Sequence, residues 1–456
     1  MFEEILFKKI EVWVLLLILV AGSIVMVFFG WGVRHYQLGN EKLGMLGEMA
    51  YEIASIPTNA RIFLTKTLSG RADLAVEEQR FDGQSGFEFN YEPGTRPDLG
   101  YMLVNRFDGD LQMSVSELVD LNKQQTVHQW RFDVNPLWEK SDFHSKIKNM
   151  PIDEPTDRFR NGHSYLFNDG TIIAKDVSPL VLADLCSNLT MVLDDDLYHH
   201  SIEMDHENNL WVAKYIEPKT TNLGSEKFRE DVIVKITPEG TILFQKSIIS
   251  LLIDHGLGYL LYGLAETNDD PTHLNDVQPV LEDGPYWKTG DVFISLRHLS
   301  MLLLYRPSTD QLIWHKSGPW VHQHDVNILD DHRISVFNNN AKLFGVDDQF
   351  VDGSNNEMIF DFSTGEVSSP YKTAFESLDI RTKWEGRGEI QKSGELFVEE
   401  TENGRLLQFN QQGELTWSLV NRGSDNQVYY VNWSRPISRE LGDRVSKLAK
   451  EQNCDK

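Results

Sequence analysis

The stretch HDVNILDDHRISVFNNN, from His324 to Asn340, sets a pattern that recurs through most of the chain. It reads as a strand, a turn rich in Asp, and a second strand in which apolar residues alternate with polar ones. Similar stretches are HSYLFNDGTIIAKD from His163, HSIEMDHENNLWVAKY from His200 and GRGEIQKSGELFVEE from Gly386. The middle of the chain therefore consists of repeated antiparallel strand pairs.

Two further copies extend the pattern. HLNDVQPVLEDGPYWKTGDVFISLRHL, from His273, fits if its turn carries an insertion, and a degenerate copy, YMLVNRFDGDLQMS, begins near Tyr101. Later strands of the units often contain Trp or Phe, as in TVHQWRFD, TILFQKS, QLIWHKS and ELTWSLV. Units of about 40 to 70 residues with several strands and no intervening helices are typical of β-propellers. Six copies predict an all-β, six-bladed propeller; the alternative is a β-sandwich or jelly roll, which would not need this internal copying.

The N-terminal part has a different character. No charged residue interrupts the run from Val12 to Val33, which as a helix reaches roughly 33 Å, enough for a hydrocarbon core of about 30 Å. A cleavable signal peptide has a shorter apolar core that ends in a small-x-small site, whereas this run continues through Trp31. We therefore expect a transmembrane anchor. A short N-terminal span before a long chain usually acts as a signal-anchor, which predicts a cytoplasmic N-terminus and a periplasmic or extracellular remainder.

These patterns predict five segments. They are a cytoplasmic N-terminus (1–11), the anchor (12–33), a juxtamembrane helical stalk (34–70), the propeller (71–440) and a polar C-terminal tail (441–456). The stalk has apolar residues at helical spacing from Leu38 to Leu68, and we expect a break at Pro57. It could also serve as a dimerising helix, so a homo-oligomer is possible.

The composition excludes some classes of partner. With 43 basic and 69 acidic residues the net charge is −26, which disfavours nonspecific binding to nucleic acid or to anionic lipid. The two cysteines, Cys186 and Cys454, do not form a CxxC motif, so a structural zinc site is not indicated. Whether they pair cannot be read from the sequence. No GxxxxGK[ST] loop is present, which is consistent with a reaction that uses no nucleotide donor.

The histidines at the starts of the repeats suggest a functional centre. In a propeller the innermost strands line one channel, so His163, His200, His273 and His324 should face one another, and Arg297 in VFISLRHL can point into the same funnel. Each histidine alone could be a polar cap on a strand. Four at matching positions are costly to gather without a ligand, because buried polar groups need partners and clustered imidazolium ions repel one another.

Two kinds of chemistry suit such a cluster. Imidazole is the commonest ligand of transition metals. Alternatively, one neutral histidine is a nucleophile while the other histidines and Arg297 bind an anion. Arg297 favours the second kind, because a guanidinium repels a metal cation but matches a pair of sulfate or phosphate oxygens.

Several motifs carry a family resemblance. HHSIEMDHENNLWV, HLNDVQPV followed by FISLRHLS, and QHDVNILDDHRISVFNNN resemble the core motifs of the arylsulfotransferases, which are exported bacterial enzymes of sulfuryl transfer. The resemblance covers roughly residues 161–431 and implies a six-bladed propeller with its active site in the central channel. It differs in two respects: an anchor and stalk replace the N-terminal β-domain of well-known members, and their nearby cysteine pair is absent.

The resemblance also implies roles for single residues. His324 matches the histidine that becomes transiently sulfated, His273 and Arg297 match residues that hold the sulfuryl oxygens, and His200 matches a further histidine of the site. Residues that could also contribute are His199, His322, His163 and Asn338. Along a strand, His322 would share a face with His324, which makes it the main rival nucleophile.

The implied reaction transfers a sulfuryl group from an aryl sulfate to a phenolic or other hydroxyl acceptor. A sulfohistidine intermediate gives ping-pong kinetics, and no cofactor or metal is required. Two alternatives stay open. One is a noncatalytic, membrane-anchored propeller that binds a glycan or a protein, and the other is a metal-dependent propeller enzyme.

Overall fold

The computed structural model describes residues 11–37, 43–69, 74–96, 99–139, 156–175, 178–216, 219–221, 223, 228–263, 269–344, 348–452 and 454. It divides into two compact units, Met1–Ala72 and Asp73–Lys456. Residues 1–10 of the expected cytoplasmic segment, together with 38–42 and 70 of the expected stalk, lie outside the described residues.

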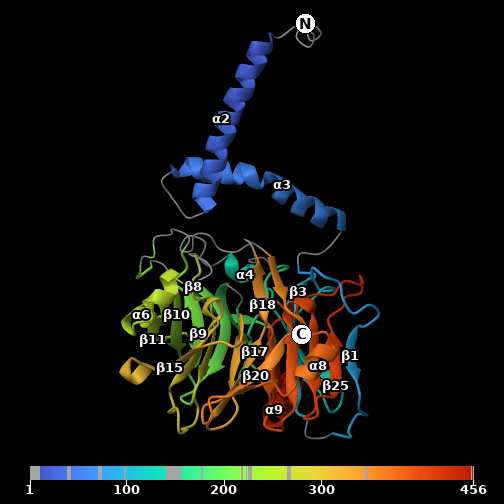
Figure 1. The fold of residues 1–456 in the computed structure, drawn as a ribbon. Helices are drawn as coiled ribbons and strands as arrows, with labels where there is room; N and C mark the ends of the chain where they lie inside the picture. Colours follow the sequence, from blue (N-terminus) through green and yellow to red (C-terminus); the bar gives the residue numbers. More distant parts are fainter. Residues whose placement is uncertain are drawn as a thin grey trace. The chain divides into compact units, whose positions relative to one another are not determined.

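The first unit contains two helices, α2 (Val12–Gln37) and α3 (Met45–Ser69), both labelled in Figure 1. From Val12 to Tyr36, α2 has a mean hydropathy of 2.9 and is long and apolar enough to cross a membrane. The expected break at Pro57 is wrong, because α3 continues through this residue. A proline removes one intrahelical hydrogen bond, and the helical residues on both sides continue across that loss.

The second unit is mostly β-structure, and its strands form antiparallel sheets. The first sheet, in spatial order, contains β26 (Arg435–Ile437), β2 (Tyr101–Asp108), β3 (Met113–Asp120) and β4 (Gln125–Arg131). The second contains β11 (Ile242–Ser247), β10 (Asp231–Ile236), β9 (Leu210–Tyr215), β8 (Leu189–Met204), β7 (Ser178–Ala183), β6 (Ile172–Ala174) and β5 (Tyr165–Leu166).

The remaining sheets come from the second half of the chain and from β1. One contains β12 (Leu274–Pro279), β13 (Val292–Leu296), β14 (Met301–Arg306) and β15 (Gln311–Ser317), and the next contains β16 (His324–Ile328), β17 (Arg333–Asn338), β20 (Asn356–Asp361) and β21 (Val367–Ser368). The last large sheet contains β1 (Gly86–Phe89), β25 (Leu415–Val420), β24 (Arg405–Phe409), β23 (Leu396–Glu400) and β22 (Arg387–Ile390). A two-stranded sheet pairs β18 (Ala341–Phe344) with β19 (Asp348–Val351).

Short helices connect or flank these sheets. They are α4 (Asn135–Trp138), α6 (Ile248–Asp254), α7 (Gly258–Gly263), α8 (Lys372–Ser377), α9 (Arg439–Gln452), and the 3₁₀ turns η2 (Arg297–Leu299), η3 (Pro307–Thr309) and η4 (Thr401–Asn403).

The arrangement is propeller-like, but the expectation of six separate blades is wrong. Among the described residues, hydrogen bonds join the strands into five sheets of four to seven strands and one two-stranded sheet. The difference arises at β8, which is 16 residues long. Its first part pairs with β7 and its last part with β9, so that one continuous strand merges two groups of strands into the seven-stranded sheet.

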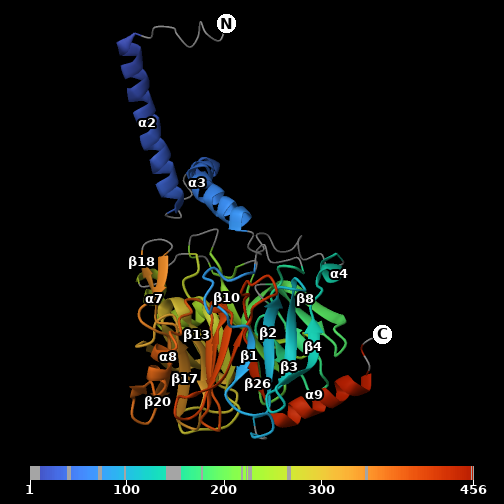
Figure 2. The same ribbon diagram turned by 90° about the vertical axis from the view of Figure 1, so that its right-hand side faces the viewer.

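Apolar clusters hold consecutive sheets face to face. Phe293 and Leu304 of one sheet pack with Val336 of the next, and Met102 of the first sheet packs with Phe397 and Trp417 of the last. The contact between the first and last sheets closes the arrangement, which Figures 1 and 2 show from two sides. Burial follows position in the sheet: β13 is buried throughout, whereas exposed and half-buried residues alternate along β15 at a sheet edge.

Both ends of the second unit are tied into sheets. β1 adds to the edge of the last sheet through β25, and β26 adds to the first sheet through β2. The segment expected to be a polar tail forms α9, which buries Val445 against the core. A disulfide joins Cys186 to Cys454 with their Cα atoms 5.1 Å apart, and this answers the question of pairing that the sequence left open.

One kind of hydrogen bond recurs between strands of neighbouring sheets. Val277 N donates to Ser201 Oγ at 2.8 Å, and Val326 N donates to Asp276 Oδ2 at 2.7 Å. Gly388 N donates in the same way to Asp325 Oδ2 at 3.1 Å. These bonds fix β8, β12, β16 and β22 against one another and thereby position the residues at the starts of these strands.

Candidate active site

Histidines from four different segments meet beside these strands. His200 lies in β8, His163 and His273 precede β5 and β12, and His324 begins β16. The ring centroid of His200 lies 5.8 Å from that of His163, 5.2 Å from that of His273 and 6.2 Å from that of His324. The convergence expected from the repeats is therefore present for all four imidazoles.

The backbone at several of these positions is unusual. His163, His200, His273 and His322 have positive φ angles between 46° and 54°, a left-handed conformation that is uncommon for residues with a side chain. Such strain is often found at functional sites. His322 lies before β16 rather than within it, so the expectation that it shares a strand face with His324 is wrong.

The orientation of the His324 ring is set by Asn339. The Asn339 side-chain nitrogen donates to the carbonyl oxygens of Glu385 at 2.7 Å and Thr382 at 3.2 Å, which fixes its Oδ1 as an acceptor. This Oδ1 lies 2.7 Å from His324 Nδ1. The proton of a neutral His324 must then reside on Nδ1, which leaves the Nε2 lone pair available for a bond to an electrophile.

The charge state of His324 supports the same conclusion. Its side chain is almost completely buried. Burial and the nearby positive charge of Arg297 hold the pKa of His324 well below its usual value, even though the hydrogen bond to Asn339 opposes this shift. His324 is consequently a neutral imidazole at pH 7, as a nitrogen nucleophile must be.

Arg297 enters the site from the end of β13. It begins η2, is only 4% exposed, and its N–H donates to the carbonyl oxygen of His273 at 3.0 Å. A buried guanidinium with its backbone fixed to His273 brings a permanent positive charge close to His324.

His199 lies in direct contact with His200. The two Nδ1 atoms lie 2.8 Å apart, the His199 ring stacks on Tyr215 with centroids 4.0 Å apart, and His199 Nε2 lies 3.2 Å from Asp231 Oδ1. Burial lowers the pKa of both histidines. These contacts fix the orientation of the His199 ring beside His200.

Asp270 and His298 are site residues that the sequence analysis missed. Asp270 Oδ2 lies 2.6 Å from His273 Nδ1, and its Oδ1 accepts from the N–H of His273 at 3.1 Å. Although burial opposes the shift, His273, His298 and Arg229 lower the pKa of Asp270, which keeps it a carboxylate. The pair directs Nε2 of His273 away from Asp270. The motif HLNDVQPV identified His273 but not its partner, because Asp270 lies three residues before the motif begins.

His298 lies on the other side of His273. Their ring centroids are 4.5 Å apart, and His298 Nδ1 lies 2.6 Å from the carbonyl oxygen of Asp270. Burial and the neighbouring His273 lower the pKa of His298 to about 4, so it is neutral at pH 7. Ligand atoms of Asp270, His273 and His298 lie within 4.8 Å of one another, close enough to hold a metal ion.

The remaining candidate residues occupy the border of the site. His163 packs against Trp433 with tilted rings whose centroids are 4.0 Å apart, and burial together with Lys175 lowers its pKa. His322 lies 6.1 Å from His298 between ring centroids. Asn338 Oδ1 accepts from Val321 N at 2.7 Å and thus shapes the loop before β16, whereas its neighbour Asn339 contacts His324.

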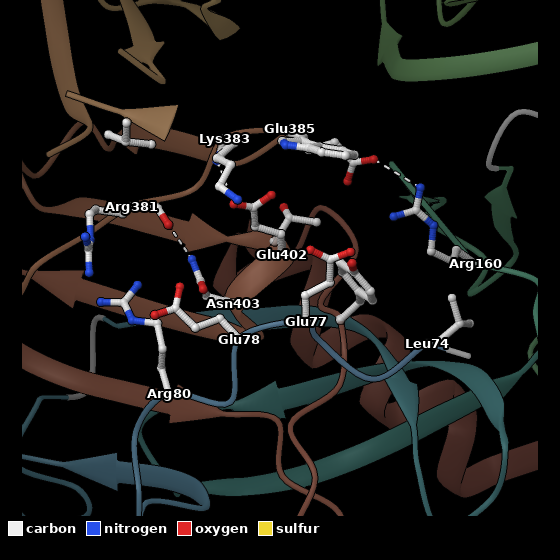
Figure 3. A pocket seen from close by; sticks show the side chains of 14 residues that line it. Leu74, Glu77, Glu78, Arg80, Arg160, Arg381, Lys383, Glu385, Glu402 and Asn403 are labelled. Carbon is white, nitrogen blue, oxygen red and sulfur yellow. Dashed lines mark hydrogen bonds and ion pairs between the residues drawn. The ribbon is translucent and has the colours of Figure 1, made fainter. Parts of the chain in front are cut away.

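A pocket of about 420 Å³ shares residues with segments that flank this centre, and Figure 3 shows its lining. Its wall includes Glu385, whose carbonyl oxygen accepts from Asn339, and Arg160, which precedes His163 by three residues. Two successive hydrogen bonds therefore connect the His324 ring with the pocket wall: His324 Nδ1 donates to Asn339 Oδ1, and the Asn339 side-chain nitrogen donates to the carbonyl oxygen of Glu385.

The β-sheets and the histidine centre define a propeller-like protein with a buried cluster of imidazoles. A family model described as Arylsulfotransferase (ASST) matches residues 182–422, which is more than half of the chain. The chain belongs to this arylsulfotransferase family.

Other comparisons are less informative. No curated protein matches the chain. A protein of unknown function from Bacteroides caccae is 9% identical over 73% of this chain and 98% of that one, with a TM-score of 0.45. A streptogramin B lyase is 11% identical over 76% and 98%, with a TM-score of 0.36. TolB from Acinetobacter baumannii is 10% identical over 74% and 66%, with a TM-score of 0.41. These scores are too low to support a conclusion about function.

Proposed function

We propose that this protein transfers a sulfuryl group from an aryl sulfate to a hydroxyl acceptor through a sulfohistidine on His324. The observation that carries the proposal is the pairing of His324 Nδ1 with Asn339 Oδ1, which presents an unprotonated Nε2 in a buried centre beside Arg297. Membership of the arylsulfotransferase family supports the same reaction class.

In the first half-reaction, Nε2 of His324 attacks the sulfur atom, and the bond between sulfur and the aryl oxygen breaks. The departing oxygen takes the electron pair and accepts a proton from Nε2 of His273, whose Nδ1 is hydrogen-bonded to Asp270. The Nδ1–H of His324 carries positive charge in the intermediate, and Asn339 Oδ1 stabilises it. Arg297 and His200 stabilise the negative charge on the sulfuryl oxygens.

In the second half-reaction, an acceptor hydroxyl attacks the same sulfur atom. The bond between sulfur and Nε2 breaks, the electron pair returns to His324, and neutral His273 takes the hydroxyl proton. The enzyme then regains its starting protonation state. This sequence gives ping-pong kinetics and consumes no nucleotide.

Intact-mass analysis tests the covalent step. Wild-type protein incubated with 4-nitrophenyl sulfate and no acceptor should gain one acid-labile increment of about 80 Da, as expected of a single sulfuryl group on nitrogen. His324→Asn should lose this increment, while His315→Asn, on the outer strand β15, serves as a matched control. An increment that survives in His324→Asn but disappears in His322→Asn would transfer the role to His322.

The site of action that we propose is the outer side of a membrane, with α2 as the anchor. Two observations support this: the length and hydropathy of α2, and the disulfide between Cys186 and Cys454, since disulfides persist in oxidising compartments. A reporter fused after Lys456 should be active only if it functions outside the cytoplasm; strong activity of a cytoplasmic reporter would contradict the location.

A metal-dependent reaction is the second candidate, favoured by the cluster of Asp270, His273 and His298. The two candidates differ in what a chelator does. Sulfuryl transfer through His324 should be insensitive to a chelator, and elemental analysis of the purified protein should find no stoichiometric metal. Activity that is lost on chelation and restored by a divalent transition metal would favour the second candidate.

A further inference from the structure

The pocket whose wall includes Glu385 and Arg160 has the properties of a ligand site. Its volume of about 420 Å³ lies in the range of small-molecule sites. Trp384 and Tyr430 are part of the wall, and 56% of the Trp384 surface is exposed. A large aromatic side chain so exposed offers an apolar face on which a ligand ring can stack.

The charged groups of the pocket balance one another. Its wall contains the acids Glu77, Glu78, Glu385 and Glu402 and the cations Arg80, Arg160, Arg381 and Lys383. In the view of Figure 3, Glu77 and Glu402 lie near the middle, with Arg80 and Arg381 on one side and Arg160 on the other.

Three of the cations are engaged by carboxylates. Arg160 pairs with Glu385 at 3.1 Å, and both Arg80 and Arg381 pair with Asp379, at 3.1 and 2.8 Å. These three guanidinium groups are thus already paired with carboxylates, which makes the pocket better suited to a neutral ligand than to an anion.

The polar groups near the middle of the pocket can both donate and accept hydrogen bonds. Burial raises the pKa of Glu402 to about 7, so protonated and ionised forms coexist at neutral pH. Its Oε1 accepts from Lys383 N at 2.8 Å, which holds the carboxyl group in place. Hydroxyl groups, which donate and accept equally, match such a lining.

We propose that this pocket binds the acceptor of sulfuryl transfer, and that the acceptor is a neutral polyhydroxyl compound such as a sugar residue of a glycan. The inference rests on the proposed function. Trp384 stacks on the apolar face of the sugar ring, and Glu77 and Glu402 bind its hydroxyl groups. One hydroxyl oxygen attacks the sulfur atom on His324, the nitrogen–sulfur bond breaks, and the product is a sugar sulfate ester.

Binding can be measured without activity, so that failure of the pocket and failure of the reaction are distinguishable. Saturation-transfer NMR of the full-length protein in detergent should detect at least one of maltotriose, cellotriose and chitotriose. Trp384→Ala should weaken this binding by tenfold or more, and Glu402→Gln should weaken it about threefold to tenfold. Tyr262→Ala, which removes a 70% exposed aromatic side chain outside the pocket, is the matched control.

Transfer then tests the link to the reaction. With 4-nitrophenyl sulfate as donor, the rate of transfer to the bound trisaccharide relative to that of transfer to phenol should fall tenfold or more in Trp384→Ala. Absence of binding by all three trisaccharides, or equal binding by wild type and Trp384→Ala, would overturn the proposal. Binding that depends on Trp384 without any sulfohistidine would preserve the sugar site and refute its role as an acceptor site.

Discussion

Asp270→Asn separates a chemical role of the Asp270–His273 pair from a structural one. Asn has nearly the same shape as Asp but carries no charge, and one of the two oxygens that accept from His273 becomes an NH2 group. The variant therefore removes the negative charge beside His273, and the dependence on the leaving group separates this loss from a displaced ring. A hydrogen bond to a charged group contributes about 1.5 to 3 kcal/mol, which corresponds to a rate factor of about 10 to 150. The 2.6 Å distance between Asp270 Oδ2 and His273 Nδ1 is typical of such a charge-assisted bond.

The effect should depend on the leaving group. Phenolate is a strong base and needs a proton as it departs, so with phenyl sulfate we expect kcat/KM to fall by about 10- to 150-fold. 4-Nitrophenolate departs readily without a proton, so with 4-nitrophenyl sulfate we expect a fall of less than about threefold. The assay is the initial rate of transfer to a common acceptor with each donor, after circular dichroism has shown that the variant is folded.

Asp331→Asn provides the control. Asp331 Oδ1 also lies 2.6 Å from a histidine, His332, but in an exposed turn between β16 and β17. This variant should leave both rates unchanged. Equal falls with both donors in Asp270→Asn would show that Asp270 only positions the backbone, and unchanged rates would remove the pair from the mechanism.

Three further predictions concern the nucleophile, the anion clamp and the disulfide. Arg297→Lys keeps the charge but loses the planar fork, so turnover should fall by one to three orders of magnitude, roughly 1.4 to 4 kcal/mol; near-normal rates in a folded variant would make the arginine structural. Because the pKa of His324 is depressed, the burst of 4-nitrophenolate should keep its rate as pH falls through about 6.5 and decline only at lower pH, whereas a midpoint near 6.5 would indicate an ordinary histidine. Cys454→Ser should lower the free energy of unfolding by about 2 to 4 kcal/mol in denaturant titrations. Reductant should lower the wild-type value equally and leave the variant unchanged, and equal stability of the two proteins would contradict a stabilising disulfide.

The repeats in the sequence were a sound guide to the strands. The stretches beginning at His163, His200, His273 and His324 all form antiparallel strand pairs, because period-two alternation and polar turns are local properties of the chain. The blade count was wrong, because the sequence does not show whether a strand ends between two groups or continues, as β8 does. The division of the chain into five segments stays a prediction.

The sequence likewise predicted some features of the candidate site and missed others. The repeated histidines and the RHL motif with Arg297 identified residues that the structure brings close together or links electrostatically. Neither the contact between Asn339 and His324 nor the one between Asp270 and His273 was foreseen. Both partners lie outside the recognised positions, and which amide or carboxylate reaches an imidazole depends on loop conformation.

By itself, the sequence determined the apolar span, the recurrence of strand pairs and the kinds of side chain available for chemistry, since each of these is encoded over a few neighbouring residues. Tertiary structure alone decided the pairing of Cys186 with Cys454 across 268 residues, the burial that depresses the pKa of His324 and the tautomer that Asn339 imposes on it. These properties depend on distances between segments far apart in the chain, and packing of the sheets against one another sets those distances.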